Sequence, residues 1–504
     1  MSANPAVTSP DDLIAQLTQK LQRAELKIQL LEEKLRLMRI AKYGPGSEKL
    51  SDGQLELLEL EPGVSGEEVQ AESKREALPR TRPATGRKHP GRQQLPADLP
   101  RVETVVPCSE KERICPQCAQ ERVVIGHEQS EQLDVEPAKY FVRVIKREKR
   151  ACRKCEEQGV VTAPVPPRII DKSLASDQIV IDTVVRKYCD HVPLYRQSAI
   201  LERDTGLELS RATLDGWVLR VGELLIPIVG AMRQELLHGT YIQADETPVD
   251  VQIEDSRGKN HQAYLWQYGR PGGSAVFDFR AGRGREGPKQ FLGQFTGLLQ
   301  TDGYAAYDHI GGPGMVHACC WSHAERYFSD AVALNPNDPL ATSIVARIDE
   351  LFAIDAEARQ QGLSVEARHS LRQEKVPPLL AIIRQQIEAA QRQVLPASQL
   401  AKACKYTLSL WDKLTRFLEY PELELSNNLA ENSMRPIAVG RRNWIHIGSL
   451  QAGPKIAAII SIVESCRRLK IPVRKYLAAV LPGMADVLIQ RLPELTPSRW
   501  ALQQ

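Results

Sequence analysis

The stretch from Tyr241 to Trp321 constrains the fold most, because the spacing of apolar residues changes from helical to strand-like at Tyr241. Segments rich in aromatic and β-branched residues follow one another, and a helical segment interrupts them after the third. The sequence therefore predicts an α/β core with three strands, a crossover helix and two further strands. The strands are expected at 241–245, 263–268, 275–279, 297–302 and 316–321, and the helix at 287–295.

This order of elements is that of a ribonuclease-H-like mixed sheet, in which the first and fourth strands are the central pair. These two strands carry Asp245 and Asp302 at one edge, and Glu431 follows in the pattern of a capped first helical turn. Carboxylates are the hard oxygen ligands that two Mg²⁺ or Mn²⁺ ions need for phosphoryl transfer. Single acids at strand ends are common, so the prediction that these three residues are catalytic depends on all three occurring together.

Composition excludes a membrane protein and favours a cytoplasmic one. The chain has 504 residues, too many for one compact core, so three or four structural units are expected. No apolar run approaches the roughly 18 residues that span a membrane, and the polar N-terminus lacks the pattern of a secretory signal. The ten cysteines are unevenly clustered, which favours a reduced compartment with a metal site over a disulfide framework.

Residues 11–43 are predicted to form a coiled-coil helix, because apolar side chains recur at alternating spacings of three and four. In a parallel pair Lys20 faces Glu25 and Lys27 faces Glu32, so self-pairing is electrostatically allowed. We expect a homodimer or higher oligomer; the alternative is a helix that folds back on its own globular body. The seam consists of Ile14, Leu17, Leu21, Ala24, Ile28, Leu31, Leu35 and Met38.

Residues 44–107 are predicted to be a linker with divided charge. Seven acids and no Lys or Arg lie in 51–73, whereas eight Lys or Arg and two acids lie in 74–101. The basic part is rich in Pro and Gly, and an extended basic segment can follow a phosphate backbone. The alternative is a solvated linker. The candidate DNA contacts are Arg87, Lys88 and Arg92.

Two CxxC pairs predict a zinc-binding domain at 108–165. They flank residues 140–145, which have strand character, and four thiolates can close tetrahedrally on one structural Zn²⁺ ion. A thioredoxin-like redox site is the alternative, but it needs one CxxC at the start of a helix. The zinc ligands are expected to be Cys115, Cys118, Cys152 and Cys155. Basic residues crowd the second pair, and Arg143, Lys146 and Arg147 are candidate DNA contacts.

Residues 172–236 have the rhythm of a helix-turn-helix DNA-binding segment. A first helix begins at Leu194, Gly206 lies in the turn, and Ser210 has the position of a cap for a second helix. Helical hairpins that only pack have the same pattern, so recognition and packing remain equal alternatives. If the segment binds DNA, the contacts are expected from Arg211, Thr213 and Arg220.

The chain resembles the large transposase of the insertion-sequence sixty-six family, a DDE transposase, over nearly its whole length. The motifs that carry the resemblance are Tyr43-Gly-Pro-Gly-Ser-Glu-Lys-Leu, Leu95-Pro-Ala-Asp-Leu-Pro-Arg, Asp245-Glu-Thr-Pro, Gln300-Thr-Asp-Gly-Tyr-Ala-Ala-Tyr, Cys320-Trp-Ser-His-Ala-Glu-Arg, Asn427-Asn-Leu-Ala-Glu, Arg435-Pro-Ile-Ala-Val-Gly-Arg-Arg-Asn-Trp and Ala452-Gly-Pro-Lys. The resemblance implies that Asp245, Asp302 and Glu431 are the DDE triad. It also implies a helical insertion at about 335–420 within a catalytic domain at 237–450.

The resemblance further implies a DNA transposase of a bacterial insertion sequence, which binds terminal inverted repeats and catalyses metal-dependent cleavage and strand transfer. The expected partners are element and target DNA and, in some elements, small accessory proteins, with the protein associated with the nucleoid. One alternative is a DNA-binding regulator with a silent ribonuclease-H-like scaffold, which predicts a missing or displaced acid. Another is a metal-dependent nuclease that does not join strands.

The residues after Glu431 are basic, with eight Lys or Arg and one acid between Arg441 and Lys475. A basic helical C-terminal element at 451–504 is therefore expected to lie near the DNA backbone, with a solvated helix face as the alternative. Cys320 and His323 form a CxxH pair that is either a metal site or, with His317 and Cys319, the packing of an apolar strand. Further candidate DNA contacts are Arg326, Arg435, Arg441, Arg442 and Lys455.

Overall fold

The structure is a computed structural model of the 504-residue chain. It describes Leu21, Lys27, Ile28, Leu31, Gln117, 120–121, 140–151, 160–252, 260–444 and 446–503. The chain divides into two units, one of residues 1–78 with 145–504 and one of residues 79–144, and almost all described residues belong to the first. Most of the predicted coiled coil, the linker at 44–107 with Arg87, Lys88 and Arg92, and the four candidate zinc cysteines lie outside the described residues.

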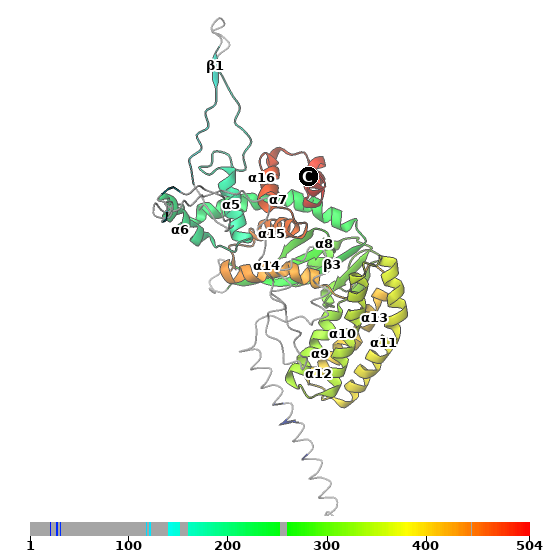
Figure 1. The fold of residues 1–504 in the computed structure, drawn as a ribbon. Coiled ribbons are helices and arrows are strands. Elements are labelled where there is room, and N and C mark those ends of the chain that lie inside the picture. Colours follow the sequence, from blue (N-terminus) through cyan, green and yellow to red (C-terminus); the bar gives the residue numbers. More distant parts are fainter. Residues whose placement is uncertain are drawn as a thin grey trace, which may run out of the picture. The chain divides into compact units, whose positions relative to one another are not determined.

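Six strands of the described part form the central sheet of the first unit, in the order β5-β4-β3-β6-β7 with β8 beside β3 (Figure 1). β3 pairs antiparallel with β4, and β4 pairs antiparallel with β5. On the other side β3 pairs parallel with β6, and β6 pairs parallel with β7. The predicted α/β class and the five predicted strands are confirmed. The elements are β3 (Tyr241–Val251), β4 (His261–Gly269), β5 (Ala275–Arg280), α8 (Glu286–Leu292), β6 (Leu298–Thr301), β7 (Val316–Cys319) and β8 (His446–Ile447).

β3 is longer than the sequence predicted, and this changes the place of Asp245. Only its first three residues, from Tyr241 to Gln243, pair with β6, whereas its antiparallel pairing with β4 continues to Val251. Asp245 therefore lies within the strand and not at its end, two residues beyond the last residue that pairs with β6. Beyond Gln243 the strand pairs only with β4 until β8 joins it at Asp250, so Asp245 lies in the part of β3 that β6 does not pair with.

Within the described range 160–252, three helices precede the sheet: α5 (Asp177–Tyr188), α6 (Leu194–Thr205) and α7 (Arg211–Leu237). Gly206 ends α6 in the left-handed conformation with φ of 71°, which glycine adopts without steric cost. The Ser210 hydroxyl then caps α7 by accepting a hydrogen bond from the Thr213 amide. The predicted helix, turn and capped helix are present, but α7 extends for 27 residues and continues along the core.

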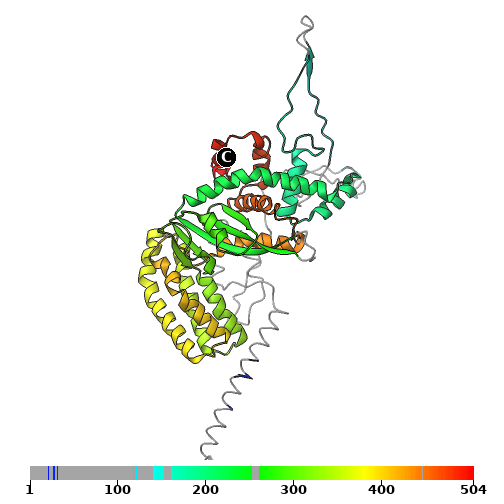
Figure 2. The same ribbon diagram turned by 180° about the vertical axis from the view of Figure 1, so that it is seen from behind.

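A second body of helices lies between β7 and the segment that carries Glu431. Figures 1 and 2 show these helices gathered on one side of the sheet, and they share a hydrophobic core of their own around Trp321, Phe328 and Phe352. Although α11 has 29 residues, none of the helices in the described part is long and apolar enough to span a bilayer. The elements are α9 (Trp321–Leu334), α10 (Pro339–Gln360), α11 (Val365–Gln393), α12 (Gln399–Ser409), α13 (Trp411–Leu414) and η3 (Arg416–Leu418), whereas the short η2 (Ala305–Tyr307) lies between β6 and β7.

Buried arginines hold this helical body to the chain that returns from it. Arg372 donates two hydrogen bonds to Asp355, at 2.7 and 2.6 Å, and both side chains are only 1% exposed. The same guanidinium donates to the Leu423 carbonyl at 2.8 Å, and Arg368 donates to the Pro421 carbonyl at 3.0 Å. Charged hydrogen bonds of this kind are strong and directional, so the segment 421–424 has a fixed path.

After the helical body, α14 packs on β3 and β4, and α15 packs on the edge strand β5. α15 packs along α7, where Gly222 is required because a Cβ at that position would lie 2.5 Å from the Lys455 carbonyl oxygen. The hydroxyls of Ser461 and Ser465 accept hydrogen bonds from the amides of Phe277 and Ala275 on the edge strand β5. The elements are α14 (Asn428–Trp444), α15 (Gly453–Arg468), α16 (Val473–Val480), η4 (Met484–Asp486), η5 (Ile489–Leu495) and α17 (Pro497–Ala501).

The strand expected at 140–145 is wrong. No strand is assigned there, and Phe141, Val142, Val144 and Ile145 are exposed. The strand β1 (Lys149–Ala151) begins four residues later and pairs antiparallel with β2 (Val160–Thr162). Branched and aromatic residues favour a strand only where a neighbouring strand pairs with it, and the described residues supply no such partner before Lys149.

We expect Asp355→Ala to destabilise the helical body by about 3–5 kcal/mol, because Arg372 would remain buried without its counter-charge. Thermal unfolding and amide exchange of α10 and α11 would measure the loss. The control is Glu350→Ala, which breaks an exposed pair with Arg347 and should cost less than about 1 kcal/mol. Equal effects of the two substitutions would contradict the assignment.

The same pair predicts a dependence on pH. Burial opposes ionisation of Asp355, but Arg372 outweighs it and lowers the pKa of this carboxyl below its usual value. A depressed folded-state pKa contributes stability that is complete above the unfolded value and is lost as the pH falls through the folded value. The stability difference between wild type and Asp355→Ala should therefore be constant near neutral pH and shrink below about pH 4.

Candidate active site

Asp245 lies on β3 at the centre of the sheet. One of its carboxylate oxygens accepts a hydrogen bond from the Glu246 amide at 2.9 Å. Burial raises the pKa of Asp245 well above its usual value, and the charges of Glu431, Glu246 and Asp302 raise it further. A carboxyl whose ionisation three other carboxylates oppose is stabilised as an anion by a cation among them.

Asp302 follows β6 directly, at the carboxyl edge of the sheet. Its Oδ1 atom accepts the Tyr304 amide at 2.7 Å, and Gly303 between them adopts φ of 90°, a conformation that favours glycine. The Tyr406 hydroxyl, from α12 of the helical body, donates to the Asp302 carbonyl. The turn after β6 is therefore held both by its own side chain and by the insertion.

Glu431 lies in the first turn of α14, as predicted, but the expected side-chain cap is not formed, because Asn427 Oδ1 accepts no hydrogen bond and Asn427 Nδ2 donates to the Ala244 carbonyl. Its Oε2 atom accepts a hydrogen bond from Arg326 at 3.2 Å, and its Oε1 atom lies 3.5 Å from His323 Nδ1. Burial opposes ionisation of Glu431, but His323 and Arg326 outweigh it and lower the pKa of this carboxyl. Glu431 is therefore an anion at neutral pH.

The structure brings the three predicted acids together from three separate elements. Glu431 and Asp302 are both close enough to raise the pKa of Asp245, although 128 residues of the chain lie between them. This arrangement fits a divalent cation, because clustered carboxylates repel one another and Mg²⁺ prefers oxygen ligands. The residues that would hold Mg²⁺ or Mn²⁺ are Asp245, Asp302 and Glu431.

A fourth carboxylate, Glu246, was missed from the sequence. Its side chain is 1% exposed, forms an ion pair with Arg283 at 2.6 Å and accepts the Tyr307 hydroxyl at 2.9 Å. The Arg283 guanidinium also lies 4.1 Å from the ring centre of Tyr304. Glu246 and Tyr307 stand within the motifs that begin at Asp245 and Gln300. Their closeness in sequence to the two aspartates could have indicated that they belong to the site.

His317 makes hydrogen bonds beside the site. Among the described residues it belongs to no cluster of side chains that could hold a metal ion. Its ring joins Thr301 at 2.9 Å to Asp308 at 3.1 Å, and Lys413 also pairs with Asp308. Burial, with help from Lys413, lowers the pKa of His317 to about 4, so the ring is neutral near pH 7. The packing alternative is the better description of His317.

The strand predicted at 316–321 is two residues too long, whereas Cys320 is fully buried, as the packing alternative predicts. The strand β7 ends at Cys319, and Cys320 is the residue before α9, with His323 in the first turn of that helix.

The candidate DNA contacts fall into two groups. Arg211, Thr213 and Arg442 are exposed, and so are Arg143, Lys146 and Arg147, although Arg147 also donates to the Ala163 carbonyl. The others make contacts within the protein: Arg220 and Lys455 with Glu223, Arg326 with Glu431, and Arg441 with Thr247 and Pro248. Arg435 lies near enough to Glu431 to lower its pKa.

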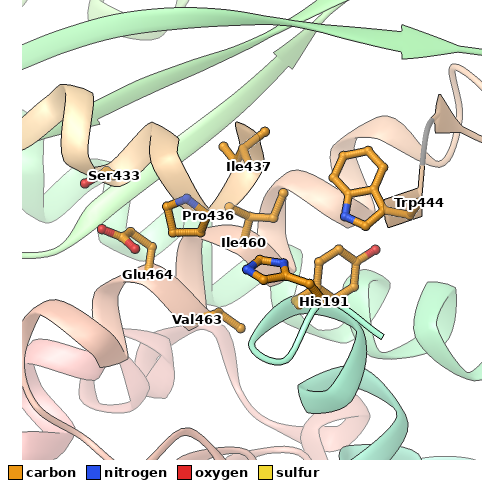
Figure 3. Close-up of a pocket in the computed structure, with 9 residues that line it drawn as sticks. His191, Ser433, Pro436, Ile437, Trp444, Ile460, Val463 and Glu464 are labelled. Carbon is orange, nitrogen blue, oxygen red and sulfur yellow. The ribbon is translucent and has the colours of Figure 1, made fainter. Parts of the chain in front are cut away.

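A small cavity also adjoins α14 but is separate from the acids. It measures about 20 Å³, room for about one water molecule. Figure 3 shows its lining, in which His191 and Trp444 face side chains of α14 and α15, including Ile437 and Ile460. None of the three acids lines it, so this cavity is not part of the acid cluster.

Comparison with known proteins agrees with these features. A family profile described as "Transposase IS66 family" matches residues 172–455. Two further profiles, "Transposase C of IS166 homeodomain" and "zinc-finger binding domain of transposase IS66", match residues 30–104 and 112–156.

Relatives that match over most of their length occur in Sinorhizobium fredii. The uncharacterized protein y4qI is 31% identical, with 94% of this chain and 89% of that protein covered. The uncharacterized protein y4jD is 32% identical over 81% of this chain and 82% of that protein. The match of the transposase profile spans the strands, the helical body and all three acids, so the chain belongs to the IS66 family of transposases.

Proposed function

We propose that the protein is a DDE transposase that binds the terminal inverted repeats of its element and catalyses DNA strand cleavage and strand transfer. The observation that carries this proposal is the convergence of Asp245, Asp302 and Glu431 at one edge of the sheet. The regulator alternative expected a missing or displaced acid, and all three are present. The family to which the chain belongs supports joining of strands over cleavage alone.

The sheet order supports a ribonuclease-H-like catalytic domain. Three antiparallel strands followed by two parallel ones, with α8 as the crossover, place β3 and β6 side by side in the middle. The carboxyl end of β6 and the middle of β3 then supply the first two acids from adjacent strands. A helix packed on β3 and β4 supplies the third.

Two Mg²⁺ or Mn²⁺ ions, when bound, would stabilise the attacking and leaving oxygens of an in-line phosphoryl transfer. The work of the protein is then to position charges. Asp245 and Asp302 are fixed by backbone hydrogen bonds, and Arg326 orients Glu431 from the neighbouring helix. Preorganised groups of this kind need no rearrangement when DNA binds, which is the chief source of rate enhancement in such sites.

The remaining parts of the chain are proposed to handle DNA and assembly. The zinc domain with Cys115, Cys118, Cys152 and Cys155, and the α6–α7 segment with Arg211 and Thr213, would recognise the element ends. The coiled coil would join two or more protomers so that both ends are held together. In the described part of that helix, Leu21, Ile28 and Leu31 are exposed apolar residues, as a seam awaiting a partner helix would be.

The triad is tested by Asp245→Asn, which removes a charge but keeps the shape of the side chain. We expect strand cleavage and strand transfer with labelled end DNA and Mg²⁺ to fall by at least about 100-fold. The control is Asp250→Asn, the same change at an exposed position of the same strand, which should leave both steps unchanged. Activity that survives Asp245→Asn would sink the proposed mechanism.

The ion pair of Glu246 gives a second prediction. Glu246→Gln weakens the hold on Arg283, whose guanidinium lies beside the turn after Asp302, so strand transfer should fall by about 10–100-fold. The protein should remain folded, as circular dichroism would show. Glu286→Gln is the control, since that side chain is 75% exposed and pairs only loosely with Lys289. If the two variants retain equal activity, Glu246 has no part in positioning the site.

A further inference from the structure

Cys320, His323 and Glu431 come together at the junction of α9 and α14. Each offers one ligand atom, and these three atoms lie within 4.8 Å of one another. Cys320 precedes the first residue of α9, His323 lies one turn later, and Glu431 projects from the first turn of α14. The three residue types are those that bind zinc in proteins, with sulfur, nitrogen and oxygen ligands.

Two of these atoms lack hydrogen-bond partners although they are buried. They are His323 Nδ1 and Glu431 Oε1, and an unpaired polar atom in such a place costs free energy. Their separation of 3.5 Å is long for a hydrogen bond between charged groups. It is close to the edge of a tetrahedron with metal–ligand bonds of about 2.0–2.1 Å, which measures about 3.3 Å.

The hydrogen bonds made by neighbouring groups leave these three ligand atoms available to a cation. Glu431 Oε2 accepts the hydrogen bond from Arg326, so Oε1 is the oxygen that remains for a cation. The Cys320 sulfur accepts a weak contact from the Asn427 amide, at 3.4 Å, and a contact from the backbone amide of His323. The side chains of His323 and Glu431 are 15% and 23% exposed, which gives an ion a route from solvent.

We propose that Cys320, His323 and Glu431 form a binding site for a thiophilic divalent cation of the zinc class. Three protein ligands leave a fourth position for water, and the thiolate and imidazole select zinc or cadmium over Mg²⁺. This site is distinct from the four-cysteine zinc domain. A further consequence rests on the proposed function: an ion here engages Glu431 and competes with Mg²⁺ for this carboxylate.

Metal binding by the purified full-length protein, without DNA, tests the site. The metal-free chain is titrated with Cd²⁺ while thiolate-to-metal charge-transfer absorbance is recorded, and bound metal is counted by mass spectrometry. We expect Cys320→Ser to bind about one equivalent less than wild type and to lose part of the absorbance. His323→Gln should lose the same equivalent, which keeps the test decisive if one variant fails to fold.

The matched control is Cys319→Ser, a neighbouring buried thiol outside the cluster, which should bind as much metal as wild type. The proposal is overturned if Cys320→Ser and Cys319→Ser bind equal amounts of Cd²⁺, which would leave the cluster as a polar contact only.

Inhibition of strand transfer separates this proposal from the proposed function. At constant Mg²⁺, added Zn²⁺ should inhibit wild type and the Cys319→Ser protein but inhibit Cys320→Ser at least about tenfold less. Equal inhibition of all three proteins would refute the competition for Glu431. If no strand transfer occurs in any protein, the proposed function fails, while the Cd²⁺ titration still decides whether the site exists.

Discussion

The placement of Glu431 depends on a group of buried arginines far from it in sequence. Arg359 and Arg368 pair with Glu424, and Arg368 and Arg372 donate to carbonyls of the same short segment. Immediately afterwards the chain enters the sheet region, where Gln243 donates to the Ser426 carbonyl at 3.0 Å. The third acid is therefore held in register with the first two by contacts made from the helical body. That body is a structural requirement of the site and not an appendage.

The sequence was sufficient for those elements whose pattern is local. Strand periodicity located β3 to β7, and Ser210 and Gly206 marked the boundary between α6 and α7 correctly. Asp302 and Glu431 were found because they stand at the end of a strand and the start of a helix, whereas Asp245 lies within the longer β3. The sequence was wrong at 140–145, where branched residues lack a pairing strand.

Partners that come from distant parts of the chain could not be predicted. Nothing near Glu246 in sequence indicates Arg283, and nothing near Arg372 indicates Asp355. For the basic stretch after Arg441, the sequence suggested an external partner where the structure shows internal ones. Its charges suggested DNA, yet Arg441 binds backbone of β3, Arg467 pairs with Glu464 and Arg474 pairs with Asp182. A charge count cannot distinguish an arginine that completes a core from one that awaits a phosphate.

The separation of the acids along the chain also has a consequence in time. Asp245 and Asp302 leave the ribosome well before Glu431, and at about 5–20 residues per second the 128 residues between the last two acids take roughly 6–26 seconds to make. The arginines that fix the path to Glu431 are themselves made during this interval. A nascent chain thus contains two of its three acids for several seconds before the third is made. In that period the set of carboxylates proposed to hold divalent cations is incomplete.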